Sequence, residues 1–230
     1  RNIDFLHEGL NEVEKEFIRI GKVFSTFDQL SEVSLFNEKK IGETELSKDF
    51  IEVWNLCDLG KKLTFGNFDP WFNGKYDPLG VVKGWAADRA VKILQKFGAE
   101  SIQVNAAGDI SLFGGYYSQE TVSPWKIGIR DPKDSQLVLK VFEKMEGAIA
   151  TSGTYEKGAH IWDPKTGLIA IGALSATVIG PNGGICEALA TGLVVAGREG
   201  ATWFNQPALA EYGAWVIDRH DRTAWSVGKL

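Results

Sequence analysis

The chain has 230 residues, of which 44% are hydrophobic and 24% charged, and its formal net charge is −5. A chain of this length and composition can bury a sizeable core, as one large domain or two small ones. The acidic excess argues against nucleic acid as the main partner, because neutralising phosphates needs a basic face. No run approaches the roughly 20 apolar residues of a membrane span.

Helical patterns come first along the chain. Residues 2–20 are predicted to form an amphipathic helix, and residues 21–37 break its period. Ser47 is predicted to cap a second helix, and residues 84–97 to form a third that Gly98 ends. Residues 64–83 hold glycine and proline at short spacing and are interpreted as a loop that buries aromatic side chains. The expected buried face of the first helix consists of Ile3, Leu6, Leu10, Val13 and Phe17.

Strand patterns dominate after residue 100, where residues 137–150 fit either a strand or a helix. Residues 184–196 are apolar enough for a buried helix that Gly197 ends. The order of elements predicts an α+β fold, a single domain over 1–230 with mixed sheets and packed helices around a ligand cleft. The predicted strands, of which the last two form a hairpin, are Ile102–Val104, Trp125–Ile129, Ala173–Ile179, Ala214–Ile217 and Thr223–Val227.

The two cysteines indicate the redox state of the chain, and its first residue bears on processing of the N-terminus. Cys57 and Cys186 lie in apolar helical patterns and are predicted to be buried free thiols, with a disulfide as the alternative. The chain starts at Arg1 without a methionine, so a removed leader, anchor or first strand is compatible with it.

Residues 150–167, ATSGTYEKGAHIWDPKTG, combine hydroxyls, a histidine and a carboxylate over a short span. Such a segment suits a polar loop that holds an anionic ligand better than it suits a packed core. Thr151 and Ser152 are candidate donors to phosphate. His160 is a candidate acid, base or hydrogen-bond donor near neutral pH, and a structural histidine is the alternative. Asp163 either orients His160 or begins an Asp-Pro turn.

Two other stretches place glycine beside a charged residue. In DPLGVVKG (77–84), Lys83 lies between two glycines at the expected start of a helix, where main-chain N–H groups can approach an anion. The alternative is a plain loop-to-helix turn with a solvated lysine. In NAAGDI (105–110), Gly108 and Asp109 follow a strand and can present a carboxylate to ribose hydroxyls, or form an ordinary turn.

The segment ICEALATGL (185–193) carries Glu187 and Thr191 four residues apart, on one face of a helix. Because their neighbours are apolar, we expect this face to look into a cleft. Carboxylate, hydroxyl and main-chain carbonyl oxygens suit Mg²⁺, which keeps water ligands and uses phosphate oxygens of its substrate. A capped or solvated helix face is the alternative.

Taken in this order, the stretches resemble the FAD:protein FMN transferase family, also called the ApbE or flavin transferase family. Each motif is weak alone, but their common order makes a chance similarity improbable. The further segments that carry the resemblance are FSTFDQLSEVSLFN (24–37), GNFDP (66–70), DPLGVVKGWAADRA (77–90), WKIGIRDP (125–132), HIWDPKTG (160–167) and SATVIGPNGGICEALATG (175–192).

The resemblance implies a T-fold-like core with FAD in its cleft and Mg²⁺ at the pyrophosphate. FMN would pass from FAD to a threonine or serine hydroxyl of an acceptor protein, and AMP would leave. The alternatives are an FAD pyrophosphatase that gives FMN and AMP, and a flavin-binding protein without turnover. The resemblance also implies a bacterial protein, of the cytoplasm or the cell envelope.

Carried over residue by residue, the resemblance assigns catalysis to His160 and Lys83. It assigns the metal to the Val82 carbonyl, Glu187 and Thr191. Glu187 stands where the family has an aspartate, Ala107 stands where it has a glycine, and the short connection before Lys83 resembles a compact subtype. The residues assigned to the flavin nucleotide are Lys83, Asp88, Gly108, Asp109, Thr151, Ser152 and His160.

Overall fold

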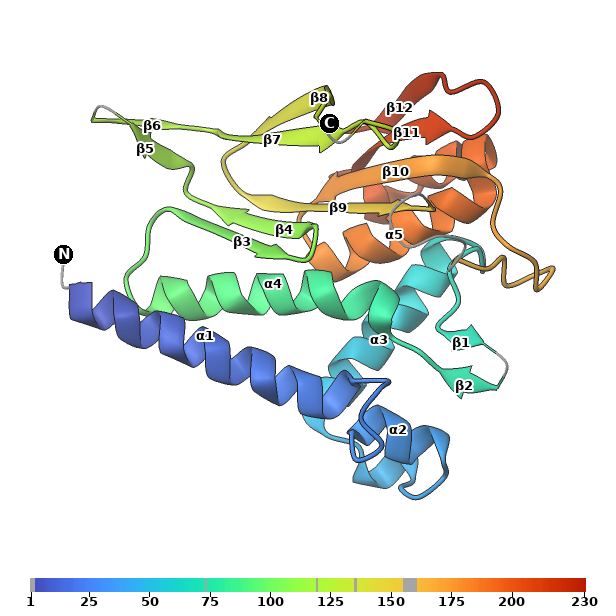
Figure 1. The fold of residues 1–230 in the computed structure, drawn as a ribbon, viewed down its shortest axis with the longest axis horizontal. Coiled ribbons are helices and arrows are strands. Elements are labelled where there is room, and N and C mark those ends of the chain that lie inside the picture. Colours follow the sequence, from blue (N-terminus) through green and yellow to red (C-terminus); the bar gives the residue numbers. More distant parts are fainter. Residues whose placement is uncertain (1–2, 73, 119, 135, 155–160) are drawn as a thin grey trace.

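The protein is described by a computed structural model that covers residues 1–230 except 1–2, 73, 119, 135 and 155–160 (Figure 1). Its helices are α1 (Ile3–Phe24), α2 (Glu32–Asn37), α3 (Lys48–Leu63), α4 (Leu79–Lys96) and α5 (Gly183–Ala196). Short 3₁₀ segments lie at η1 (Glu43–Glu45), η2 (Gly197–Asn205) and η3 (Pro207–Leu209). No described helix is long and apolar enough to cross a membrane.

The main sheet has six strands in the order β12-β11-β10-β9-β4-β3, with every neighbouring pair antiparallel. These strands are β3 (Ile102–Ala106), β4 (Asp109–Phe113), β9 (Gly147–Gly153), β10 (Ala173–Gly180), β11 (Gly213–Asp218) and β12 (Ala224–Gly228). Three two-stranded ribbons complete the described strands: β1 (Trp71–Phe72) with β2 (Lys75–Tyr76), β5 (Tyr116–Ser118) with β6 (Thr121–Ser123), and β7 (Trp125–Arg130) with β8 (Val138–Lys144).

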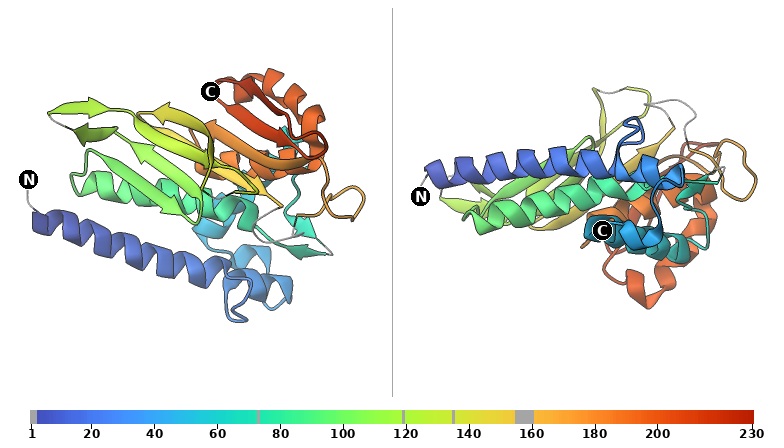
Figure 2. Two further views of the ribbon diagram at one scale, coloured as in Figure 1. Left: turned by 45° about the horizontal axis from the view of Figure 1, so that its top comes forward. Right: turned by 90° about the horizontal axis from the view of Figure 1, so that it is seen from below.

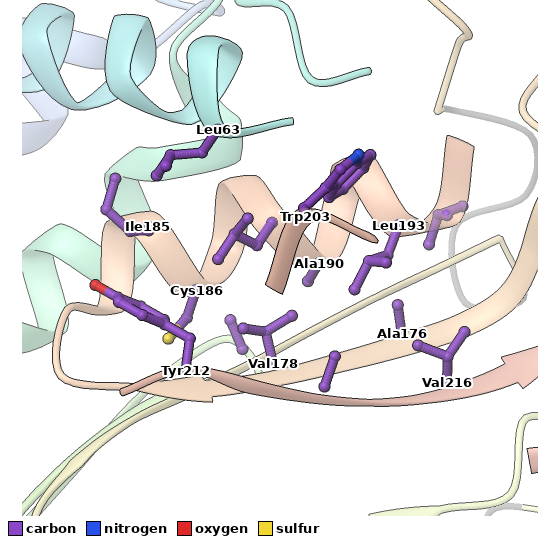
Figure 3. Packing of buried hydrophobic residues seen from close by; sticks show 14 of the residues in the cluster. Leu63, Ala176, Val178, Ile185, Cys186, Ala190, Leu193, Trp203, Tyr212 and Val216 are labelled. Atoms are coloured by element: carbon purple, nitrogen blue, oxygen red, sulfur yellow. The ribbon is translucent and has the colours of Figure 1, made fainter. Parts of the chain in front are cut away.

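Each face of the main sheet buries a different apolar cluster, as strand alternation requires. On one face α5 packs against small residues of β9 and β10, and Figure 3 shows Ala190 and Leu193 of this helix near Ala176 and Val178. On the other face the β7–β8 ribbon packs through Ile127 and its neighbours. Helix α4 lies beside α5 on the first face, with α1 alongside it (Figures 1 and 2).

The helix predictions are confirmed in type and differ at the ends. The Ser47 hydroxyl accepts a hydrogen bond from the Phe50 N–H at 3.2 Å, so Ser47 caps α3 as predicted. Helix α4 begins at Leu79 rather than at residue 84, directly after Pro78. Gly98 has φ of +80° just beyond its end, the left-handed conformation that stops a helix.

The predicted buried face of the first helix is wrong at Ile3, Leu10 and Phe17, which are exposed, whereas Leu6 and Val13 are half-buried. Ile3 and Leu10 are more than half exposed, whereas Ile20, Val23 and Phe24 are buried. Helix α1 instead packs along α4 through a different face: Gly9 is buried beside Phe97, and the rings of Phe5 and Phe97 lie 4.9 Å apart (Figure 1).

Several segments gain definition from the structure. Residues 137–150, left open between strand and helix, belong to β8 and the start of β9. The loop predicted over 64–83 ends where α4 begins at Leu79; it contains the β1–β2 hairpin and buries Phe68 and Tyr76 as predicted. Cys57 and Cys186 are buried free thiols, and burial raises the pKa of both, so they stay protonated at neutral pH.

Candidate functional site

Helices α4 and α5 cross in main-chain contact, at a pair of glycines. A Cβ atom added to Gly84 would lie 2.2 Å from the Gly183 carbonyl oxygen, and one added to Gly183 would lie 2.5 Å from the Gly84 carbonyl oxygen. Only glycine fits at such a distance. The close crossing lets the Gly84 N–H donate to Glu187 Oε2 at 3.1 Å. It therefore places the Glu187 carboxylate against the N-terminal half of α4.

Lys83 lies at the centre of a charged cluster at this crossing. Its ammonium forms an ion pair with Glu187, contacts Asp109 Oδ2 at 3.1 Å and donates to the Leu79 carbonyl at 3.3 Å. The Asp109 and Glu187 side chains are 5% and 3% exposed, whereas that of Lys83 is 38% exposed. One ammonium that solvent can reach thus contacts two nearly buried carboxylates.

Asp109 reaches Lys83 because of the tight turn that precedes it. Ala107 and Gly108 connect β3 to β4 with φ of +54° and +103°, and Ala106 pairs with Asp109 across the turn. The Gly108 N–H donates to Asn105 Oδ1 at 2.8 Å and closes the turn. Gly108 therefore holds the turn that directs the Asp109 side chain.

Asp88 belongs to a different part of the crossing. It accepts hydrogen bonds from Ser111 Oγ at 2.6 Å and from the Gly183 N–H at 2.7 Å, at the first residue of α5. Burial raises the pKa of Asp88, and these two hydrogen bonds partly oppose that rise. Asp88 also lines a cleft of about 510 Å³ whose lining does not include Lys83. Its assignment to the flavin nucleotide stays a prediction.

Thr151 and Ser152 are adjacent on β9 and therefore point to opposite faces of the sheet. The Ser152 hydroxyl lies 3.0 Å from the Thr191 hydroxyl, on the side of α5. The Thr151 hydroxyl lies 2.9 Å from that of Thr177, its cross-strand partner on β10. The structure therefore brings Ser152 beside Thr191, one of the predicted metal ligands, and places Thr151 on the opposite face of the sheet.

His160 lies outside the described residues, so its role stays a prediction. The turn that follows it is described. Asp163 accepts a hydrogen bond from the Lys165 N–H at 2.9 Å and from the Thr166 hydroxyl at 2.9 Å. Asp163 thus stabilises the Asp-Pro turn, which was the second of its two predicted roles.

Of the predicted metal ligands, Glu187 and Thr191 have the donor atoms that a divalent cation bound together with a phosphate group requires. Within the described residues, no three side chains of the His, Cys, Asp and Glu types are grouped so as to hold a metal. Glu187 and Thr191 instead offer one carboxylate and one hydroxyl on successive turns of α5. Val82 lies within α4, one residue before Lys83, and the use of its main-chain carbonyl as a third ligand stays a prediction. Hard oxygen donors in so small a number suit Mg²⁺, which completes its shell with water and phosphate oxygens.

Comparisons with known proteins identify a family. The model of the ApbE family matches residues 73–212. The chain is 35% identical over 125 residues to the FAD:protein FMN transferase of Rhodobacter capsulatus, covering 51% of this chain and 23% of that protein. It is 36% identical over 129 residues to the one of Vibrio cholerae, covering 52% of this chain and 38% of that protein. The chain thus spans well under half the length of these curated relatives.

Solved structures share the fold. An ApbE protein from Thermotoga maritima superposes with a TM-score of 0.83 at 24% identity, covering 96% of this chain and 89% of the other. The flavin transferase ApbE from Vibrio cholerae superposes with a TM-score of 0.79 at 22% identity, covering 96% and 88%. The predicted α+β fold of ApbE-like proteins is confirmed.

Proposed function

The chain belongs to the ApbE family, and from this membership we propose that it transfers FMN from FAD to a threonine or serine hydroxyl of an acceptor protein. The acceptor oxygen forms a bond to the FMN phosphorus, and the bond from that phosphorus to the bridging oxygen of AMP breaks. The hydroxyl proton is released and AMP leaves with the bridging oxygen. The observation that carries the proposal is the convergence of Lys83, Asp109 and Glu187 at the α4–α5 crossing.

The roles of the residues follow from charge. Phosphoryl transfer depends mainly on positioning and on neutralising charge at the phosphates. We assign the positioning of the phosphates to the Ser152 side of β9 and to the Gly108–Asp109 turn. We assign the neutralisation of their charge to Lys83. Glu187, Thr191 and the Val82 carbonyl would hold Mg²⁺, which supplies charge neutralisation at the pyrophosphate when bound.

The remaining predicted residues complete the proposal. His160 would hold or move the proton of the acceptor hydroxyl, the task of an acid–base group near neutral pH. Asp88 and Thr151 would act on the flavin nucleotide indirectly, since the first bonds to the start of α5 and the second faces away from Thr191.

One experiment separates this function from its alternatives. The protein is incubated with FAD, Mg²⁺ and an acceptor protein that presents a threonine, and AMP release and the mass of the acceptor are measured. AMP together with an FMN adduct supports transfer, AMP without an adduct indicates a pyrophosphatase, and FAD binding without AMP indicates a flavin-binding protein. A further arm uses Thr191→Val, which keeps the shape of the side chain and removes a hard oxygen donor. AMP release at limiting Mg²⁺ should fall about tenfold or more, and an unchanged rate would remove Thr191 from the metal site.

A further inference from the structure

The ammonium of Lys83 has no donor left for a phosphate. An ammonium group carries three N–H donors. In this structure Lys83 has three acceptors, which are the Glu187 carboxylate, Asp109 Oδ2 and the Leu79 carbonyl. To bind a phosphate oxygen, Lys83 therefore has to give up one of these partners.

The two oxygens of Glu187 are held in different ways. Oε2 accepts from the main-chain N–H of Gly84, which the helix crossing fixes in place. Oε1 is held by the ammonium of Lys83, at the end of a flexible side chain that is partly open to solvent. The partner of Oε1 can therefore be exchanged, while Oε2 keeps the carboxylate in position.

We propose that the Lys83 ammonium is the cation that pairs with Glu187 when no metal is bound. In the ligand-free protein its ammonium occupies the position on Glu187 that a divalent cation takes, and cation binding releases Lys83 toward the phosphates. This inference rests on the proposed function, because it needs a metal and a phosphate ligand at the same crossing. Asp109 keeps the released ammonium close by, since it contacts Lys83 independently of Glu187.

The exchange has a consequence for binding. The metal and the lysine compete for one carboxylate, so the bare protein binds a divalent cation weakly. Once the metal is bound, the ammonium becomes available to FAD, and the metal and FAD strengthen each other's binding. The longer side chain of glutamate, where the family has aspartate, gives Glu187 the reach to meet both Gly84 and Lys83.

The test measures metal binding without FAD, so that turnover plays no part. Mn²⁺ binding to the wild-type protein, Lys83→Met, Lys83→Arg and Lys96→Met is followed by electron paramagnetic resonance of the free ion. Lys83→Met should bind Mn²⁺ about tenfold more tightly, because it removes the cation that competes with the metal for the nearly buried Glu187 carboxylate. Lys83→Arg keeps a cation in the pocket and should stay near the wild type. Lys96→Met removes the same charge from an exposed position in the last turn of α4 and should also stay near the wild type.

The outcomes are distinct. Equal or weaker Mn²⁺ binding by Lys83→Met would overturn the competition, and so would tighter binding shared equally by Lys96→Met. If Lys83→Met does not fold, judged by circular dichroism, Lys83→Gln keeps a polar head group and answers the same question. AMP release from FAD by the wild-type protein is measured separately, with Mg²⁺ and the acceptor protein present. Its absence would refute the proposed function, whereas AMP release with unchanged Mn²⁺ binding in Lys83→Met would refute only the exchange.

Discussion

The glycine contact between α4 and α5 can be tested by adding a single methyl group. Gly84→Ala places a Cβ 2.2 Å from the Gly183 carbonyl oxygen and 2.3 Å from its carbon, and neither main-chain atom can swing aside. The helices have to separate, at a cost of about 3 kcal/mol, while alanine regains about 0.8 kcal/mol of helix propensity. The free energy of unfolding should therefore fall by about 2 kcal/mol.

The matched control is Gly21→Ala in α1. A Cβ on Gly21 meets nothing within 4 Å, and both substitutions change the unfolded chain in the same way. Gly21→Ala should raise the free energy of unfolding by about 0.5–1 kcal/mol. Urea denaturation of both variants measures the difference. A Gly84→Ala variant as stable as Gly21→Ala would refute the reasoning, because it would mean that the helices cross without the close contact.

Three further predictions concern single positions. Burial raises the pKa of Asp88 above its ordinary value of 3.8. At pH values above 3.8 the native state therefore binds more protons than the unfolded state, and the free energy of unfolding decreases as the pH rises. Asp88→Asn removes that pH dependence. The free energy of unfolding of the variant, minus that of the wild type, should therefore increase between about pH 4 and about pH 7 when both are measured by urea titration. A difference that stays constant over this range would contradict the raised pKa. Ala107 adopts φ of +54°, so Ala107→Gly should stabilise the protein by about 0.5 kcal/mol in thermal denaturation, whereas destabilisation would argue against a left-handed residue there. His160→Ala should slow FMN transfer about 10²-fold with little loss of FAD binding; a single-turnover rate near wild type at saturating FAD would make His160 structural.

The sequence is most informative where the partners are neighbours along the chain. The Ser47 cap and the shared face of Glu187 and Thr191 depend on spacings of three and four residues, and local helix geometry sets them. The contact between Lys83 and Glu187 joins residues 104 positions apart. No periodicity predicts it, because it depends on how two helices cross.

Strand alternation could have predicted more than it did. Asp109 and Ser111 are two residues apart on β4, so a strand there puts both on the face toward α4, where they meet Lys83 and Asp88. The same rule separates Thr151 from Ser152 once residues 147–153 are known to be a strand. The interpretation of residues 150–167 as a polar loop hid that separation. Grouping adjacent hydroxyls into one phosphate site suits a loop and fails on a strand.

The crossing of α4 and α5 places an acidic side chain of each helix against the main chain of the other. Glu187 of α5 accepts from the Gly84 N–H of α4, and Asp88 of α4 accepts from the Gly183 N–H of α5. Both bonds require the two main chains to touch, which only the absence of side chains at Gly84 and Gly183 allows. The position of the Glu187 carboxylate therefore depends on two glycines, Gly84 and Gly183, which have no functional side chain. A substitution at either glycine should disturb the Asp88 contact and the Lys83 cluster together, whereas a substitution at Ser111 should weaken only the former.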